Sequence, residues 1–201
     1  DTIKGGDEGD ILDGEAGADV VEGEGGDDLI TYNRDDDTLD GGADIDTLKV
    51  ALTTGAAVTM SLVGPSVTSD GVTLDGFENV DGSGSTVALD ITGNSDANTL
   101  TGGAGDDILK GGDGEDQIEG STGHDLIIGG AQDDILSGGN GADTIIGQSG
   151  SDTMTGGQGA DVLRGGQGTD TFIATLGDGT DVYKGNGGLD TVDYSAAGTG
   201  L

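Results

Sequence analysis

The feature that most constrains this chain is a nine-residue motif, which occurs eight times without insertion from Gly102 to Ile173. The first copy reads GGAGDDILK and the last reads GGQGTDTFI. The shared pattern is G-G-x-G-x-D-x-U-x, in which U is a large apolar residue. A short period kept over many copies is typical of a solenoid, in which each repeat packs only against its neighbours.

Each repeat is expected to supply one turn and one strand. Positions 1 to 6 are rich in glycine, which reaches backbone angles closed to other residues, so they predict a tight turn. Positions 7 to 9 predict a very short strand with position 8 pointing inward. Two repeats would complete one coil, so that residues 18 apart stack. The predicted inward residues are Leu109, Ile118, Ile127, Leu136, Ile145, Met154, Leu163 and Phe172. The fold class predicted is all-β, a right-handed parallel β-roll.

The charge balance indicates what could hold such a chain together. There are 40 Asp and Glu residues against 6 Lys and Arg, and only 2% of the residues are aromatic. Without counter-charge, repulsion and glycine entropy would leave the chain largely disordered. The scarcity of basic residues argues against nucleic acid as a partner, and no apolar run is long enough for membrane insertion. The expected partner is a hard cation, calcium first.

The repeat places oxygen ligands where calcium needs them. Stacking brings sixth-position carboxylates together on one edge, and a cation between stacked loops would remove their repulsion. Two carboxylates with several backbone carbonyls give about the six to eight oxygens that calcium prefers. Zinc would favour nitrogen or sulfur, and the chain has one His and no Cys.

We therefore predict about ten calcium ions, bound by the sixth-position acids and the turn glycines. The predicted carboxylate ligands are Asp10, Asp19, Asp28, Asp37, Asp46, Asp107, Asp116, Asp125, Asp134, Asp143, Asp152, Asp161, Asp170, Asp181 and Asp190. The predicted glycines of the metal-binding turns are Gly102, Gly103, Gly105, Gly111, Gly112, Gly114, Gly129, Gly130, Gly138, Gly139, Gly141, Gly156, Gly157 and Gly159.

The chain divides into four parts, the first of which is a looser calcium block over residues 1–49. Glu8, Asp35 and Asp44 stand at its fourth positions, and Tyr32-Asn33 replaces one Gly-Gly pair, so weaker or missing ions are expected at those turns. Asp1 to Lys4 match the end of a preceding repeat, which suggests a fragment of a longer chain.

Residues 50–92 break the period and alternate apolar with polar residues, which predicts short strands. The predicted inward residues here are Val58, Met60, Leu62, Phe77, Val80, Val87, Leu89 and Ile91. We interpret this part as wider, ion-free coils of the same solenoid, closed by packing; a separate small β domain is the alternative.

The main calcium block covers residues 93–173 and begins with a degenerate repeat that has Asn98 in the acid position and Leu100 inside. Residues 174–201 slip the phase by two and add degenerate repeats, with Tyr183 and Val192 inside, and a closing strand.

The eight phased copies resemble the repeats-in-toxin (RTX) family of hemolysin-type calcium-binding repeats, over about two-thirds of the chain. Asp107 to Asp170 match the ligand position of that family at every ninth residue. The resemblance implies a parallel β-roll with calcium between stacked loops, one-step (type I) secretion from Gram-negative bacteria, and folding that waits for external calcium. The departures are Ser121 and Gln148 at the second position and Gln132 at the fourth, where a side chain is expected to strain the turn.

The function expected is therefore a secreted calcium-binding module that folds on calcium and serves as a scaffold or docking unit. The alternative is a calcium-binding accessory module of a secreted enzyme such as an epimerase, lipase or protease; a structural role in a surface layer or adhesin is a third. No catalytic residues are predicted, because His124 is the only His and lies on a loop.

One further surface stands out. Outward positions of alternate repeats are apolar, which suggests a docking face for another domain or a second copy. These residues are Ile108, Leu126, Ile128, Ile146 and Val162, whereas the opposite face carries mostly Gln117, Glu119, Ser137, Thr153, Thr155 and Thr171.

Overall fold

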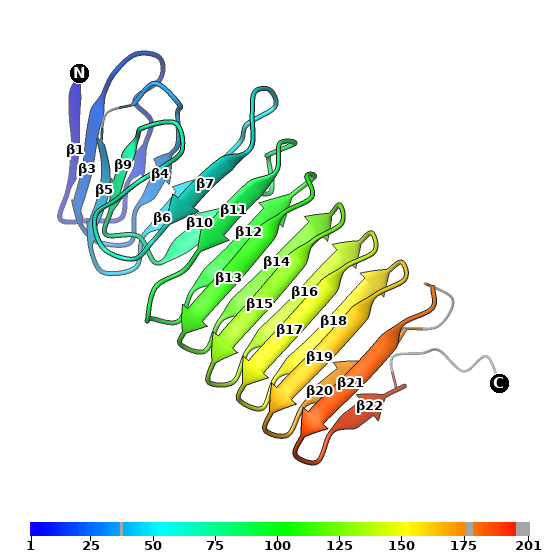
Figure 1. Cartoon of the computed structure of the whole chain (residues 1–201). Coiled ribbons are helices and arrows are strands. Elements are labelled where there is room, and N and C mark those ends of the chain that lie inside the picture. The colour runs from blue at the N-terminus through cyan, green and yellow to red at the C-terminus, as the bar shows by residue number, and fades with distance from the viewer. Residues whose placement is uncertain (37, 176–178, 196–201) are drawn as a thin grey trace.

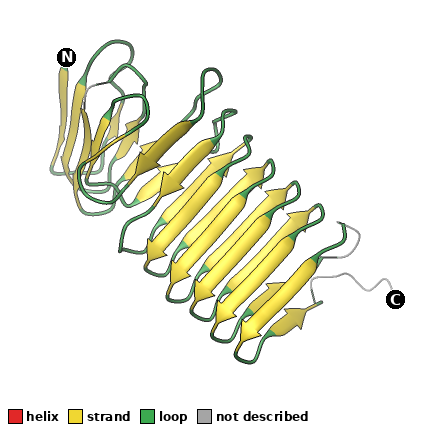
Figure 2. Ribbon diagram, viewed as in Figure 1, coloured by secondary structure: helices red, strands yellow, loops and turns green. Residues whose placement is uncertain are grey.

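The computed structural model describes residues 1–36, 38–175 and 179–195, and within them the chain forms an elongated all-β stack of coils (Figure 1). No helix occurs among these residues, so none is long and apolar enough to span a membrane. The turns line the edges of the stack, as Figure 2 shows for the C-terminal two-thirds of the molecule.

Three sheets build the solenoid. The ten-stranded sheet contains, in spatial order, β2 (Ile11–Leu12), β4 (Leu29–Thr31), β6 (Thr47–Lys49), β10 (Asn79–Asp81), β12 (Thr99–Gly103), β14 (Gln117–Thr122), β16 (Ile135–Asn140), β18 (Thr153–Gln158), β20 (Thr171–Ile173) and β22 (Thr191–Asp193). The seven-stranded sheet contains β7 (Val58–Ser61), β11 (Leu89–Thr92), β13 (Ile108–Asp113), β15 (Leu126–Ala131), β17 (Thr144–Ser149), β19 (Val162–Gln167) and β21 (Val182–Gly187). The five-stranded sheet contains β1 (Thr2–Gly6), β3 (Val20–Gly25), β5 (Thr38–Ala43), β9 (Thr73–Asp75) and β8 (Ser66–Val67).

The register confirms the predicted coil of two repeats. Leu109 pairs with Ile127 and Ile127 with Ile145 in the seven-stranded sheet, each step being 18 residues. Every pairing is parallel except that of β8 with β9. The fold is therefore the parallel β-solenoid that the period predicted.

The strands are longer than the three residues predicted. Most strands of the main block have six residues, because strand pairing continues through the glycine pair that opens the next repeat. Gly112, for example, pairs with Gly130. The turn is accordingly confined to about three residues around the fourth to sixth positions of each repeat.

A single apolar column fills the space between the sheets. All eight predicted inward residues of the main block are buried, and so are Val58, Met60, Leu62, Phe77, Val80, Leu89 and Ile91, whereas Val87 is partly buried. Val192 was predicted inside but is 36% exposed. It pairs with Phe172 in β20, yet no further described coil covers its other side.

Residues 50–92 contribute strands to all three sheets. β10 lies between β6 and β12, β9 follows β5, and β11 joins β7 to β13. Strands therefore hydrogen-bond across residues 49, 92 and 173, and one core cluster runs throughout. The four-part division stays a prediction about the kinds of coil.

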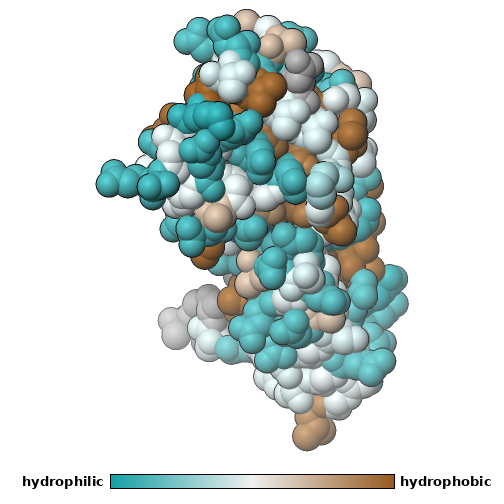
Figure 3. Space-filling model, turned by 90° about the vertical axis from the view of Figure 1, so that its left-hand side faces the viewer, coloured by the Kyte–Doolittle hydropathy of each residue, from teal (hydrophilic) through white to brown (hydrophobic). Residues whose placement is uncertain are grey.

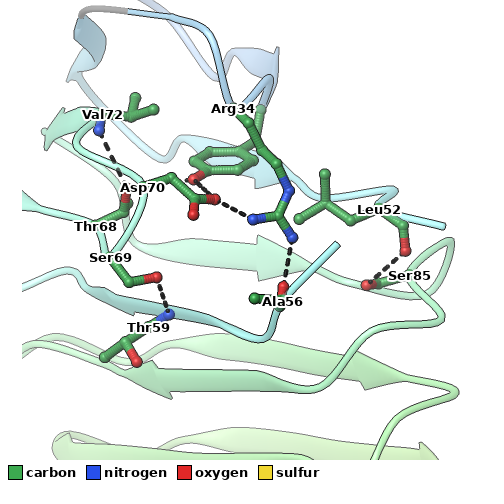
Figure 4. A network of polar contacts seen from close by, with 10 residues as sticks. Arg34, Leu52, Ala56, Thr59, Thr68, Ser69, Asp70, Val72 and Ser85 are labelled. Carbon is green, nitrogen blue, oxygen red and sulfur yellow. Dashed lines mark hydrogen bonds and ion pairs between the residues drawn. The ribbon is translucent and has the colours of Figure 1, made fainter. Parts of the chain in front are cut away.

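A polar network ties this middle part to the first block (Figure 4). Tyr32, at a position usually held by glycine, is buried and its hydroxyl donates to Asp70 Oδ2 at 3.2 Å. Arg34 donates to the same carboxylate and, at 2.6 Å, to the carbonyl oxygen of Ala56. A protein cation thus links the two parts at the place where the repeat has lost its glycines.

Candidate metal centre

The sixth-position acids form hydrogen-bonded columns along the edges of the stack. The Asp107 N–H donates to Asp125 Oδ1 at 2.8 Å, and the Asp125 N–H donates in turn to Asp143 Oδ1 at 2.8 Å. A second column runs from Asn98 to Asp170, in which each backbone N–H donates to Oδ1 of the aspartate 18 residues further on. Each carboxylate is thereby fixed between two successive coils.

These carboxylates are buried and only half satisfied. From Asp107 to Asp170 each sixth-position Asp is at most 2% exposed. Whereas Oδ1 accepts the backbone bond, Oδ2 has no hydrogen-bond partner among the described residues in Asp19, Asp28, Asp46, Asp107, Asp116, Asp125, Asp134, Asp143, Asp152 and Asp170. Leaving buried anionic oxygens without partners is costly, so the column requires a cation or protons.

The raised pKa values of these carboxyl groups also indicate that their negative charge needs a cation or protons. Burial, with added repulsion from Asp116 and Asp152, raises the pKa of Asp134 to about 7. Burial and neighbouring acids likewise raise the pKa of Asp125, Asp143 and Asp152 to about 6. Because these shifts come from desolvation and like charge, a bound divalent cation would reverse them.

The first glycine of each repeat creates the space that the unpaired oxygens face. A methyl group on Gly102 would contact Asp107 Oδ2 and, at 2.8 Å, the carbonyl oxygen of Gly120 in the next coil. The same pair of oxygens, one carboxylate and one carbonyl, surrounds Gly111, Gly138 and Gly147. Stacked loops therefore direct both kinds of calcium ligand at one gap.

The other predicted glycines allow backbone angles that side chains disfavour, within the strands at the second position and in the turn at the fourth. The second-position residues Gly103, Gly112, Gly130, Gly139 and Gly157, and the fourth-position residues Gly114, Gly141 and Gly159, all have positive φ. Gly105 does not; a side chain there would instead meet the backbone of Ala88. Ser121, Gln132 and Gln148 hold φ near +80°, so the strain expected at these three departures is present.

No group of three or more acidic or imidazole side chains converges as a metal site in the described part of the chain. This agrees with a ligand set of one or two carboxylates completed by carbonyl oxygens. The exposed His124 takes part in no such group; its Nδ1 accepts the Ala142 N–H at 2.9 Å.

The outer predicted ligands differ from the central ones. Asp10 and Asp181 are partly exposed and Asp190 is exposed, although Asp181 and Asp190 still accept bonds from Asp161 and Asp170. Asp37 lies outside the described residues. Asp10, Asp181 and Asp190 occupy the ends of the columns, where fewer coils exclude water.

The repeat pattern missed two carboxylates, one that continues a column and one that lies beside Asp19. Glu78 Oε2 accepts the Asp46 N–H at 2.8 Å and so continues a column across the irregular middle part. Asp36, at a fifth position, is 4% exposed and has an unpartnered Oδ1. Only the sequence Asp35-Asp36-Asp37 hinted at the second, since any of three adjacent acids could face inward.

Comparison with known families gives one match. The model of the RTX calcium-binding nonapeptide repeat matches residues 1–30 and 33–48 and, through five overlapping stretches, residues 92–180. The unmatched residues 49–91 are essentially the part where the period breaks. Comparison with curated proteins gave no match.

Proposed function

This chain belongs to the RTX calcium-binding nonapeptide repeat family and is a calcium-binding β-roll module, and on that premise we propose that it folds only as it binds calcium. The observation that carries the proposal is the column of buried, half-satisfied carboxylates. In the unfolded chain these groups are hydrated and far apart, so the ligand sets exist only when the coils stack. Ion binding and folding are then a single event.

Charge neutralisation supports a large number of ions. The formal net charge is -34, and the sixth-position carboxylates that carry part of it are stacked in columns. About ten calcium ions, one for each pair of stacked loops, would cancel more than half of that charge. In the face shown in Figure 3, hydrophobic residues form separate patches among hydrophilic and neutral ones.

Ion counting tests the proposed stoichiometry. Native mass spectrometry of the calcium-loaded chain should show about ten bound ions. Asp134→Asn should bind at least one fewer, because Asp134 lies between the loops of two neighbouring coils. Asp133→Asn is the matched control, since Asp133 is an exposed neighbour. A wild-type chain that holds only one or two ions would contradict the proposal.

We further propose that the module acts after export, where calcium is abundant, as a folding and scaffold unit of a secreted protein. The repeat itself is a non-catalytic type of module. Attachment to a secreted enzyme as an accessory unit is the alternative, and the sequence of the parent protein distinguishes the two.

The predicted apolar face supports a docking role. Ile108, Leu126, Ile128, Ile146 and Val162 lie half-buried on the outward side of the seven-stranded sheet, in adjacent registers. Its two ends differ in charge: Asp90 at one end forms an ion pair with Lys110 at 3.2 Å, whereas Arg164 lies beside Lys184 at the opposite end. A second copy packed face to face would cover the apolar residues of both faces, so we propose a two-fold dimer.

Sedimentation in calcium tests this dimer. The wild-type chain should dimerise, and Leu126→Ser with Ile146→Ser should leave a folded monomer, because the centre of the apolar face is lost. Ile135→Ser is the control, since Ile135 is exposed on the opposite sheet. A wild-type chain that stays monomeric at high concentration would count against the docking role.

A further inference from the structure

The turn formed by residues 32–36 departs from the repeat in both sequence and geometry. Tyr32-Asn33 replaces the glycine pair, and the Tyr32 side chain turns away to Thr68 and Asp70. The turn is held locally, because the Asn33 N–H donates to Asp36 Oδ2 at 3.1 Å and the Asp36 N–H donates to the Asn33 carbonyl at 3.3 Å. As a result, Asp36 at the fifth position faces inward.

Asp36 points at the loop stacked above it. Its Oδ1 lies 3.0 Å, and Asp19 Oδ2 lies 3.1 Å, from the point where a methyl group on Gly14 would stand. Both side chains are 4% exposed, and neither oxygen has a hydrogen-bond partner among the described residues. Asp19 Oδ1, by contrast, accepts a bond from the backbone nitrogen of Asp1 at 2.7 Å.

This arrangement differs from that of the regular loops in one chemical respect. Around Gly102 or Gly111, the gap is faced by one carboxylate oxygen and one neutral carbonyl oxygen. Around Gly14, the two nearest oxygens are both carboxylate oxygens, from Asp19 and Asp36.

We propose that Asp19 and Asp36 form a calcium site that lies outside the nonapeptide pattern. Two buried carboxylate oxygens without partners that face one gap attract a divalent cation, as the two carboxylates of a regular site do. Backbone carbonyls and water complete the coordination. The site anchors the irregular turn to the first block, where the glycine pair is missing. This inference rests on the proposed calcium-dependent function, which it extends to a specific non-repeat turn.

The test measures calcium binding to the full chain by competition with a chromophoric chelator and by native mass spectrometry. Asp36→Asn should weaken this site at least tenfold and should lower by one the number of ions that native mass spectrometry counts. Asp35→Asn is the matched control, because Asp35 is exposed beside it, and should bind as the wild type does.

A second variant keeps every charge and covers the case in which Asp36→Asn fails to fold. Gly14→Ala puts a methyl group between the two oxygens at a residue whose φ is not positive, and should also bind one ion fewer. Equal affinity and ion number in Asp36→Asn, Gly14→Ala and Asp35→Asn would overturn the site while leaving the module's calcium binding intact. Absence of calcium binding in the wild type would overturn the proposed function as well.

Discussion

In excess chelator at pH 7.5, this chain should lose nearly all of its β-strand circular dichroism and expand to the dimensions of an unfolded chain. The two buried columns that contain Asp107 and Asp170 would otherwise hold a series of partnerless carboxylate oxygens at close spacing. Repulsion among them, added to the conformational entropy of 45 glycines, exceeds what one narrow apolar column contributes. Adding calcium in the millimolar range should restore the strand signal over a narrow concentration range, because each filled site stabilises its neighbours.

Acidification should partly replace calcium. The pKa values of Asp125, Asp134, Asp143 and Asp152 are about 6 to 7 in the folded chain, against an ordinary value of 3.8. Between about pH 4 and pH 7 the folded, metal-free state therefore binds more protons than the unfolded state. Its stability is greatest below that range and is lost as the pH rises through it.

Circular dichroism in chelator at pH 4.5 and 7.5 measures this difference directly, and magnesium at pH 7.5 is the control for nonspecific screening. Strand signal should appear at pH 4.5 but not at pH 7.5, and magnesium should restore little of it, since it dehydrates reluctantly and demands octahedral geometry. Equal strand content in chelator and in calcium at pH 7.5 would refute the coupling of folding to calcium.

Gly141→Gln should be among the most damaging single substitutions in the main block, whereas Gln132→Gly should be mildly stabilising. Both residues stand at the fourth position of their repeats. Gly141 has φ +141°, which suits glycine alone, and a Cβ there would overlap the carbonyl oxygen of Gly123 in the preceding coil. Gln132 has φ +79°, where a side chain is strained but accommodated.

We expect Gly141→Gln to cost roughly 3–5 kcal/mol, from backbone strain together with a lost contact between coils. Gln132→Gly should gain about 1 kcal/mol by relieving a left-handed residue. Urea unfolding in saturating calcium and the calcium midpoint of folding measure both effects. Similar midpoints for the two variants would show that the fourth-position turn is more adaptable than its packing indicates.

The structure of the regular part of this protein could be predicted from its nine-residue period. Eight in-phase copies predicted the parallel solenoid, the 18-residue stacking and the burial of residues such as Leu109 and Phe172, and the structure confirms these. The irregular parts were harder to predict. Strand length was underestimated because glycine pairs were assigned to turns, whereas parallel pairing continues through them. Burial of Val192 was wrong, because a pattern gives the direction of a side chain and not the presence of a covering coil.

The sequence by itself determined the unit of structure and the need for cations, because period and net charge are properties of the chain and do not depend on distant contacts. Only the tertiary structure decided which carboxylate oxygens remain unpaired, since that depends on the backbone N–H groups 18 residues away. It also brought Glu78 to Asp46, Arg34 to Asp70, and Asp36 to Asp19. The first two pairs join the first block to the irregular middle part, and the third comes from a turn that has lost its glycine pair. No local pattern specifies how such turns meet when the coils stack.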